Sequence, residues 1–116
     1  MIKFVGMLKC KPGMTAEEFH RYWREVHAPL AMGVQEFARY VRKYVQSHAI
    51  ESQVAVSGAG GNPPLDGLAE LWFDSPGDLR KAFSEPRYMS VIRPDELKFL
   101  DLPNCVTLIV EEIAMM

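Results

Sequence analysis

Three strand-like segments with apolar residues on both faces constrain the fold most. They are "IKFVGMLKCK" (2–11), "GLAELWFD" (67–74) and "NCVTLIVEEI" (104–113). Successive side chains of a strand point to opposite faces of its sheet, so these strands need cover on both sides. A fourth segment, "RYVRKYVQSH" (39–48), alternates and is rich in valine and tyrosine, which also predicts a strand.

Two segments carry helix signals. Thr15, followed three residues later by Glu18, is typical of a capping box that begins a helix. Pro29 disfavours helical backbone at the residue before it, so the regular helix should end or kink near His27. The apolar stripe of this helix has i, i+3, i+4, i+7 spacing and consists of Phe19, Tyr22, Trp23 and Val26.

A second helix should begin at Ser75-Pro76, because serine caps helices and proline suits their first position. Residues 85–101 predict one or two further helical turns, and the Gly- and Pro-rich residues 49–65 predict a long loop. The resulting order is β-α-β-β-α-β. We therefore predict an α+β, ferredoxin-like antiparallel sheet with two helices on one side, in a single domain spanning 1–116.

This two-layer fold covers only one face of the sheet. An uncovered apolar sheet would exceed the patches of about 300–600 Å² that soluble monomers usually expose. A second copy of the chain, packed sheet to sheet with two-fold symmetry, is the simplest cover. We therefore predict a homodimer that pairs through its sheet faces.

Composition excludes several classes of function. The net charge of −2 gives no electrostatic case for nucleic acid or for an anionic membrane. No apolar run reaches the ~18 residues of a membrane span, and the first residues are typical of a strand rather than of a signal peptide, so we expect a cytoplasmic protein. No cysteine or histidine cluster has zinc spacing, so no metal site is predicted.

His27 is the first candidate catalytic residue. At ~100° per residue, His27 falls on the flank of the buried stripe, at the end of the helix. The helix dipole favours its charged form and partial burial favours its neutral form, so it should titrate near physiological pH as a general acid or base does. The alternative is a structural histidine that caps helix carbonyls.

His48 is the second candidate catalytic residue. It ends the predicted strand 39–48 and shares a face with Tyr40 and Tyr44. These side chains would line a proton-handling aromatic pocket, or else lie in the dimer interface with their hydroxyls satisfied.

Glu70 and Trp72 lie on one face of the predicted strand 67–74. A buried glutamate needs a partner or a raised pKa, and either Arg39, Arg42 or Lys43, or a histidine, would supply the partner. A structural ion pair and a general base both remain open for Glu70. Trp72 is expected in the core or in a pocket wall. The side chains predicted to shape a substrate site are Tyr22, Trp23, Tyr44, Glu70 and Trp72.

Several stretches resemble a known family. "MIKFVGMLKCKPGMTAEEFHRYWREVHAPLA" is similar to the opening of EthD-type domains, "PPLDGLAELWFDSPGDL" to their central segment, and "FLD" and "VEE" to their end. The spacing from Arg39-Tyr40-Val41 to His48 is also similar to that in EthD-type domains. The resemblance implies the dimeric α/β-barrel superfamily, in which ferredoxin-like subunits pair through their sheets, and it places His27 in the family motif.

The resemblance implies a companion of oxidative catabolism or secondary metabolism. No flavin, haem or nicotinamide motif is visible, which favours a cofactor-independent oxidoreductase, isomerase or cyclase acting on a small hydrophobic organic, lactone or phenolic compound. His27 or His48 would then move a proton. Two alternatives remain: a non-catalytic protein that holds a metabolite for a partner monooxygenase, and a haem-binding relative within the same superfamily.

Overall fold

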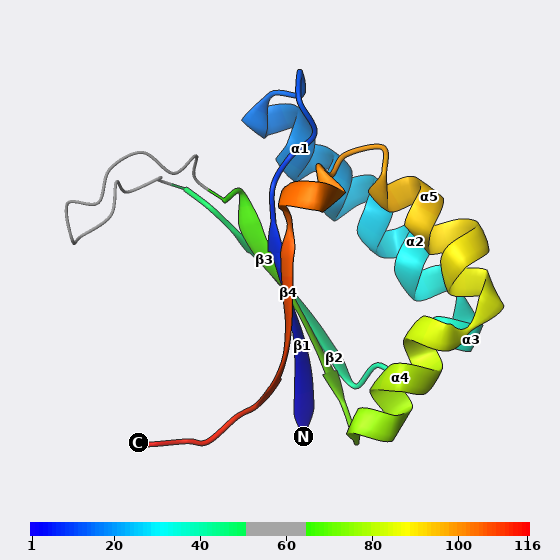
Figure 1. Cartoon of the computed structure of the whole chain (residues 1–116). Coiled ribbons are helices and arrows are strands. Elements are labelled where there is room, and N and C mark those ends of the chain that lie inside the picture. The colour runs from blue at the N-terminus through cyan, green and yellow to red at the C-terminus, as the bar shows by residue number, and fades with distance from the viewer. Residues whose placement is uncertain (51–64) are drawn as a thin grey trace.

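The computed structural model describes residues 1–50 and 65–116. Its four strands form one antiparallel sheet in the order β2-β3-β1-β4. All of the helices lie on one side of this sheet (Figure 1). The predicted ferredoxin-like α+β fold is confirmed. The strand bounds are β1 Ile2–Leu8, β2 Lys43–His48, β3 Gly67–Phe73 and β4 Val106–Glu111.

The helical layer is built from two runs of short helices. The first run comprises α1 Ala16–Tyr22, η1 Trp23–His27, α2 Ala28–Gly33 and α3 Gln35–Ala38. The second comprises α4 Pro76–Ser84, η2 Tyr88–Ile92 and α5 Arg93–Glu96, and a 3₁₀ turn, η3 Leu102–Asn104, precedes β4. The predicted capping box of Thr15 and Glu18 begins α1, and the Ser75 side chain caps α4.

The predicted interruption near His27 is a π-helical turn, and one sequence-based boundary was wrong. The regular helix α1 ends at Tyr22, the run widens into the π-helical turn η1, and it continues through Gly33. A proline has no N–H and its ring crowds the carbonyl four residues earlier, a conflict that a wider turn relieves. Strand β2 begins at Lys43 rather than at residue 39, so Tyr40 lies in a turn, outside the face that carries Tyr44 and His48.

The main core lies between the sheet and the helices. Every second residue of β3 is buried against the helices, and the alternate residues point away from them. The core includes the fully buried side chains Phe19, Trp23, Phe73, Ile92 and Phe99. Packing between the two layers therefore anchors both helical runs on one face of the sheet.

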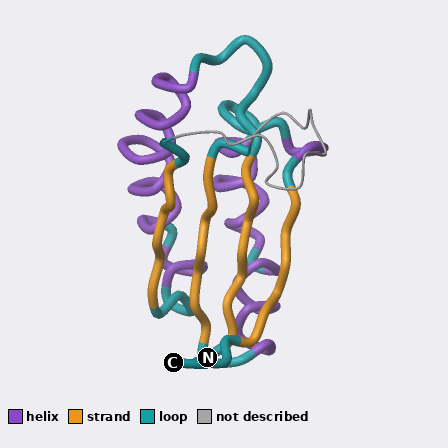
Figure 2. Tube along the Cα trace, turned by 90° about the vertical axis from the view of Figure 1, so that its left-hand side faces the viewer, coloured by secondary structure: helices purple, strands orange, loops and turns teal. Residues whose placement is uncertain are grey.

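Within residues 1–50 and 65–116, no helix lies on the opposite face of the sheet (Figure 1). Figure 2 views the molecule from this side, with the four strands in front and the helices behind. On this outer face Leu108 of β4 is 49% exposed, and Val106 and Leu68 are also exposed. Residues 49 and 50 leave β2, but most of the predicted 49–65 loop lies outside the described residues. Within the described part of the chain, no helix has the length and apolar character needed to span a bilayer.

Candidate active site

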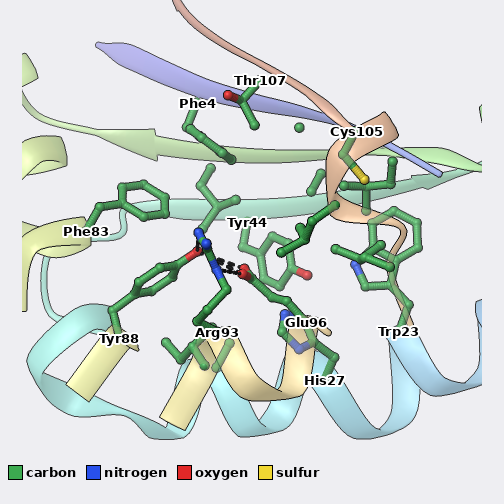
Figure 3. Close-up of a pocket in the computed structure, with 18 of the residues that line it drawn as sticks. Phe4, Trp23, His27, Tyr44, Phe83, Tyr88, Arg93, Glu96, Cys105 and Thr107 are labelled. Carbon is green, nitrogen blue, oxygen red and sulfur yellow. Dashed lines mark hydrogen bonds and ion pairs between the residues drawn. The ribbon is translucent and has the colours of Figure 1, made fainter. Parts of the chain in front are cut away.

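A cavity of about 220 Å³ lies between the sheet and the helical layer. Its floor is the inner face of the sheet, and its walls are the π-helical turn η1 and the segment 88–102 (Figure 3). Most of the lining is apolar or aromatic, as is typical of sites for small organic ligands. The polar or titratable side chains in the lining are His27, Tyr44, Tyr88, Arg93, Glu96, Cys105 and Thr107.

His27, which lines the cavity, forms a buried acid–base pair with Asp95, which is not part of the lining. His27 Nδ1 lies 2.8 Å from Asp95 Oδ2, and the two residues are only 7% and 3% exposed. A carboxylate accepts a hydrogen bond from Nδ1–H, which fixes the tautomer and leaves Nε2 to accept a proton. Among the described residues, no side chain or backbone group bonds that second ring nitrogen. This is the arrangement of a general base oriented by a carboxylate.

Tyr22 holds Asp95 from the other side. Its hydroxyl donates to Asp95 Oδ1 across 2.5 Å. Burial, together with the bond to Asp95 and its charge, raises the pKa of Tyr22 to about 12, so the phenol stays a donor at neutral pH. The structure thus places Tyr22 behind the His27–Asp95 pair, where it positions the carboxylate rather than lining the cavity.

His27 lies in a π-helical turn, and Asp95 follows another. In η1 the Ala28 N–H bonds the carbonyl of Trp23, five residues back, and in η2 Arg93 bonds Tyr88 in the same way. Single π turns inside helices are frequent at functional sites. Here one turn contains His27, and the other directly precedes the short helix that contains Asp95.

A second polar group enters the cavity from α5. Arg93 Nε lies 2.7 Å from Glu96 Oε1, and the Tyr88 hydroxyl donates to Glu96 Oε2 across 2.8 Å. Burial and the Glu96 charge raise the pKa of Tyr88, so it stays protonated and keeps donating. The three side chains meet in the cavity (Figure 3). Because Arg93 compensates the charge of Glu96, this corner adds hydrogen-bonding capacity without an isolated buried charge.

Tyr44 and Trp23, both predicted to bind substrate, line the cavity. Gln46 Nε2 donates to the Tyr44 hydroxyl across 2.8 Å. Burial raises the pKa of Tyr44, although the donors Gln46 and Trp23 oppose that effect. A Cβ on Gly67 would lie 2.7 Å from the Trp23 ring, so the missing side chain allows the indole to pack this closely on the sheet.

His48, the second predicted catalytic residue, lies on the inner face of the sheet but is not part of the cavity lining. Its Nδ1 lies 2.7 Å from His20 Nδ1, its Nε2 lies 2.8 Å from Gln46 Oε1, and its ring packs 4.4 Å from that of Trp23. Desolvation, followed by the charges of His20 and Arg24, lowers the pKa of His48. It is thus connected to the cavity through other side chains.

Glu70 and Trp72 point to the outer face, away from the cavity. Glu70 pairs with Lys3 at 2.7 Å rather than with Arg39, Arg42 or Lys43. Lys3 lies on the neighbouring strand β1, whereas Arg39 and Arg42 precede β2 and pair with Glu85 and Asp74. Trp72 contacts Lys3 and Lys43 through its ring. Neither residue belongs to the candidate site.

Asp95, Glu96, Arg93 and Tyr88 are the site residues that sequence reasoning missed. A signal was present in the spacing of the segment 86–102. Positions 88, 92, 95 and 99 recur at intervals of four, three and four, which is a helical apolar stripe, and all four are buried. An aspartate on such a stripe must have hydrogen-bond partners.

The fold and the site together define a small ferredoxin-like α+β protein with a carboxylate-oriented histidine in an apolar cavity. The model of the EthD domain matches residues 11–103. The chain therefore belongs to the EthD domain family, as the resemblance implied.

Two curated relatives are dehydratases. The chain is 27% identical over 97 residues to "Dehydratase ustZ" of Ustilaginoidea virens, covering 78% of this chain and 69% of the relative. It is 28% identical, again over 97 residues, to the "Conidial pigment biosynthesis dehydratase EthD" of Metarhizium robertsii, covering 78% and 68%.

Solved structures share the fold. An EthD family protein from Bacillus halodurans superposes with a TM-score of 0.69 at 19% identity, over 97% of this chain and 99% of the other. A dimeric protein of ferredoxin-like fold and unknown function from Bacteroides fragilis superposes with a TM-score of 0.64 at 11% identity, over 96% of this chain and 95% of the other. Structural neighbours of this chain thus include a dimeric protein.

Proposed function

We propose that this protein is a cofactor-independent dehydratase of secondary metabolism, which removes water from a small hydrophobic hydroxy-carbonyl compound on the way to a phenolic product. The observation that carries this proposal is that His27 lines an apolar cavity and is paired with the buried carboxylate of Asp95. The names of the curated relatives supply the reaction class. Proton transfer also underlies the isomerase and cyclase reactions predicted from the sequence, so the same pair serves the broader class.

The geometry suggests one sequence of steps. His27 Nε2 removes the proton from the carbon next to the substrate carbonyl, and Asp95 stabilises the imidazolium that forms. The electron pair of the broken C–H bond forms a C=C bond as the C–O bond to the leaving hydroxyl breaks. The imidazolium returns its proton to that hydroxyl, so water leaves and neutral His27 is restored. Tyr44 donates a hydrogen bond to the carbonyl oxygen, where negative charge develops.

A dehydration assay tests the proposal. Cyclic β-hydroxyketones fused to an aromatic ring would be screened for the ultraviolet absorbance of the conjugated product. We expect His27→Ala to lower kcat/KM by about 10²–10⁴-fold, the usual contribution of a general acid–base group. Asp95→Asn should also lower it strongly, whereas Asp74→Asn, a matched change at an exposed surface pair, should have no effect.

Equal turnover by the wild type and His27→Ala would overturn the proposal. If the ketones bind without turnover, and the protein instead raises the activity of a partner oxygenase, the accessory role predicted from the sequence would be correct.

We further propose that the protein works as a homodimer that pairs through the outer faces of its sheets. The exposed apolar residues of β3 and β4 support this arrangement, and the dimeric neighbour shows that the fold admits dimers. Sedimentation at micromolar concentration tests it, and single copies at every concentration would contradict it.

A further inference from the structure

A chain of side-chain hydrogen bonds runs from helix α1 to the cavity. It links His20 Nδ1 to His48 Nδ1 at 2.7 Å, His48 Nε2 to Gln46 Oε1 at 2.8 Å, and Gln46 Nε2 to the Tyr44 hydroxyl at 2.8 Å. Tyr44, Gln46 and His48 are alternate residues of β2, so they share the inner face of the sheet. Of these four hydrogen-bonded side chains, only Tyr44 lines the cavity.

The direction of each bond follows from the groups involved. Gln46 Nε2 also lies 3.1 Å from the backbone carbonyl of Trp23, which can only accept, so the amide nitrogen must face Trp23 and Tyr44. The amide oxygen therefore faces His48, and His48 Nε2 must carry the hydrogen. With Nε2 protonated, the neutral ring of His48 accepts at Nδ1, and His20 donates to it.

These bond directions determine whether the Tyr44 hydroxyl is free to donate. Its oxygen accepts from Gln46 Nε2. The hydroxyl hydrogen has no acceptor among the described residues, and Tyr44 projects from the sheet into the cavity (Figure 3). Tyr44 is thus set to donate to a ligand, and a ligand oxygen that only accepts, such as a ketone, matches it.

We propose that Gln46 and His48 are positioning residues that hold the Tyr44 hydroxyl as a hydrogen-bond donor for the carbonyl oxygen of the substrate. This role deepens the proposed dehydratase function and rests on it for the identity of the substrate. In this role His48 orients Gln46 and does not itself transfer a proton to or from the substrate. Packing of its ring on Trp23 fixes the imidazole, and thereby the amide of Gln46.

The test uses a bound ketone rather than turnover. The probe is 1-tetralone labelled with ¹³C at its carbonyl, and its infrared stretch reports hydrogen bonding directly. In the wild type we expect the stretch at a lower frequency than in an apolar solvent. Tyr44→Phe, Gln46→Met and His48→Leu should each raise the frequency and weaken binding by about two- to tenfold, the contribution of one neutral hydrogen bond.

Three controls separate positioning from packing. His48→Gln keeps an N–H donor near the place of Nε2 and should retain the wild-type frequency. Tetralin, which lacks the oxygen, should bind the wild type and the variants equally. Ser47→Ala, on the opposite face of the same strand, should change nothing.

Any of three results would overturn the proposal. The carbonyl frequency in His48→Leu could equal that in the wild type, the carbonyl could lack a hydrogen bond in the wild type, or the ketone could show no saturable binding. The infrared readout needs no catalysis, so the two proposals can fail separately. Dehydration without a carbonyl shift would contradict only the positioning role, and a carbonyl shift without dehydration would contradict only the dehydratase function.

Discussion

The two faces of the sheet are made from the same strands but differ in their surroundings. On the inner face of β3, Gly67, Ala69, Leu71 and Phe73 are buried beneath the helices, whereas Leu68, Glu70 and Trp72 on the outer face are partly open. Around the cavity on the inner side, polar side chains form separate hydrogen-bonded groups. On the outer face Lys3 pairs with both Glu70 and Glu112, and the same face carries the exposed apolar residues Leu68 and Leu108. The proposed catalysis uses the inner face of the sheet, and the proposed dimer uses the outer face.

The largest effect should come from removing a fully buried inner-face side chain. Phe73→Ala leaves a cavity beside Phe83 and should lower the free energy of unfolding by about 3–5 kcal/mol. Trp72→Ala, one residue away on the outer face, is the matched control. In urea titrations the loss in Phe73→Ala should not depend on protein concentration, whereas the loss in Trp72→Ala should. Equal, concentration-independent losses would remove the distinction between the faces.

Gly67→Ala should have the next largest effect. The added Cβ would lie 2.6 Å from the carbonyl oxygen of Ser47 and 2.7 Å from the ring of Trp23, so backbone or indole must shift. We expect a loss of about 1–3 kcal/mol in unfolding free energy, as is usual for overpacking. At Gly33 a Cβ would meet no heavy atom within 4 Å, so Gly33→Ala should be neutral or slightly stabilising. A tolerated Gly67→Ala would show that the inner face is loosely packed.

A charge on the outer face should affect association rather than folding. Leu108→Lys places an ammonium group where we propose that two sheets meet, and it should weaken self-association at least tenfold, or about 1.4 kcal/mol. Circular dichroism should remain unchanged. Met89→Lys, at an exposed apolar position in the helical layer, is the control and should leave sedimentation as in the wild type. Dissociation in both variants would argue against a specific interface.

The smallest effect should be a pH dependence from the inner face. Because the pKa of His48 is lowered in the folded protein, its contribution to stability is complete above the unfolded-state pKa of about 6.5 and is lost as pH falls through the folded-state pKa. Urea unfolding between pH 8 and pH 5 should show wild-type stability falling more than that of His48→Gln. Parallel curves of stability against pH would mean that folding does not lower the pKa of His48.

The sequence contained enough information for the fold but only part of the site. Strand patterns and two helix caps predict the element order, and the position of His27 on the flank of its stripe predicts a boundary residue that could reach a cavity. Asp95 could not be assigned as its partner, since the two residues are 68 positions apart and meet only when both helical runs dock on the sheet. The face of Glu70 was predictable by alternation, but its partner Lys3 depends on strand register.

The π-helical turns make the pairing of His27 with Asp95 sensitive to chain length. A π turn holds one residue more than the α-helical phase requires, and one residue corresponds to a rotation of about 100° around the axis. Deleting a single residue from η1, the turn that contains His27, would let that run return to a continuous α-helix. The imidazole and the carboxylate would then face different directions. A one-codon deletion in η1 should therefore separate the pair in this protein.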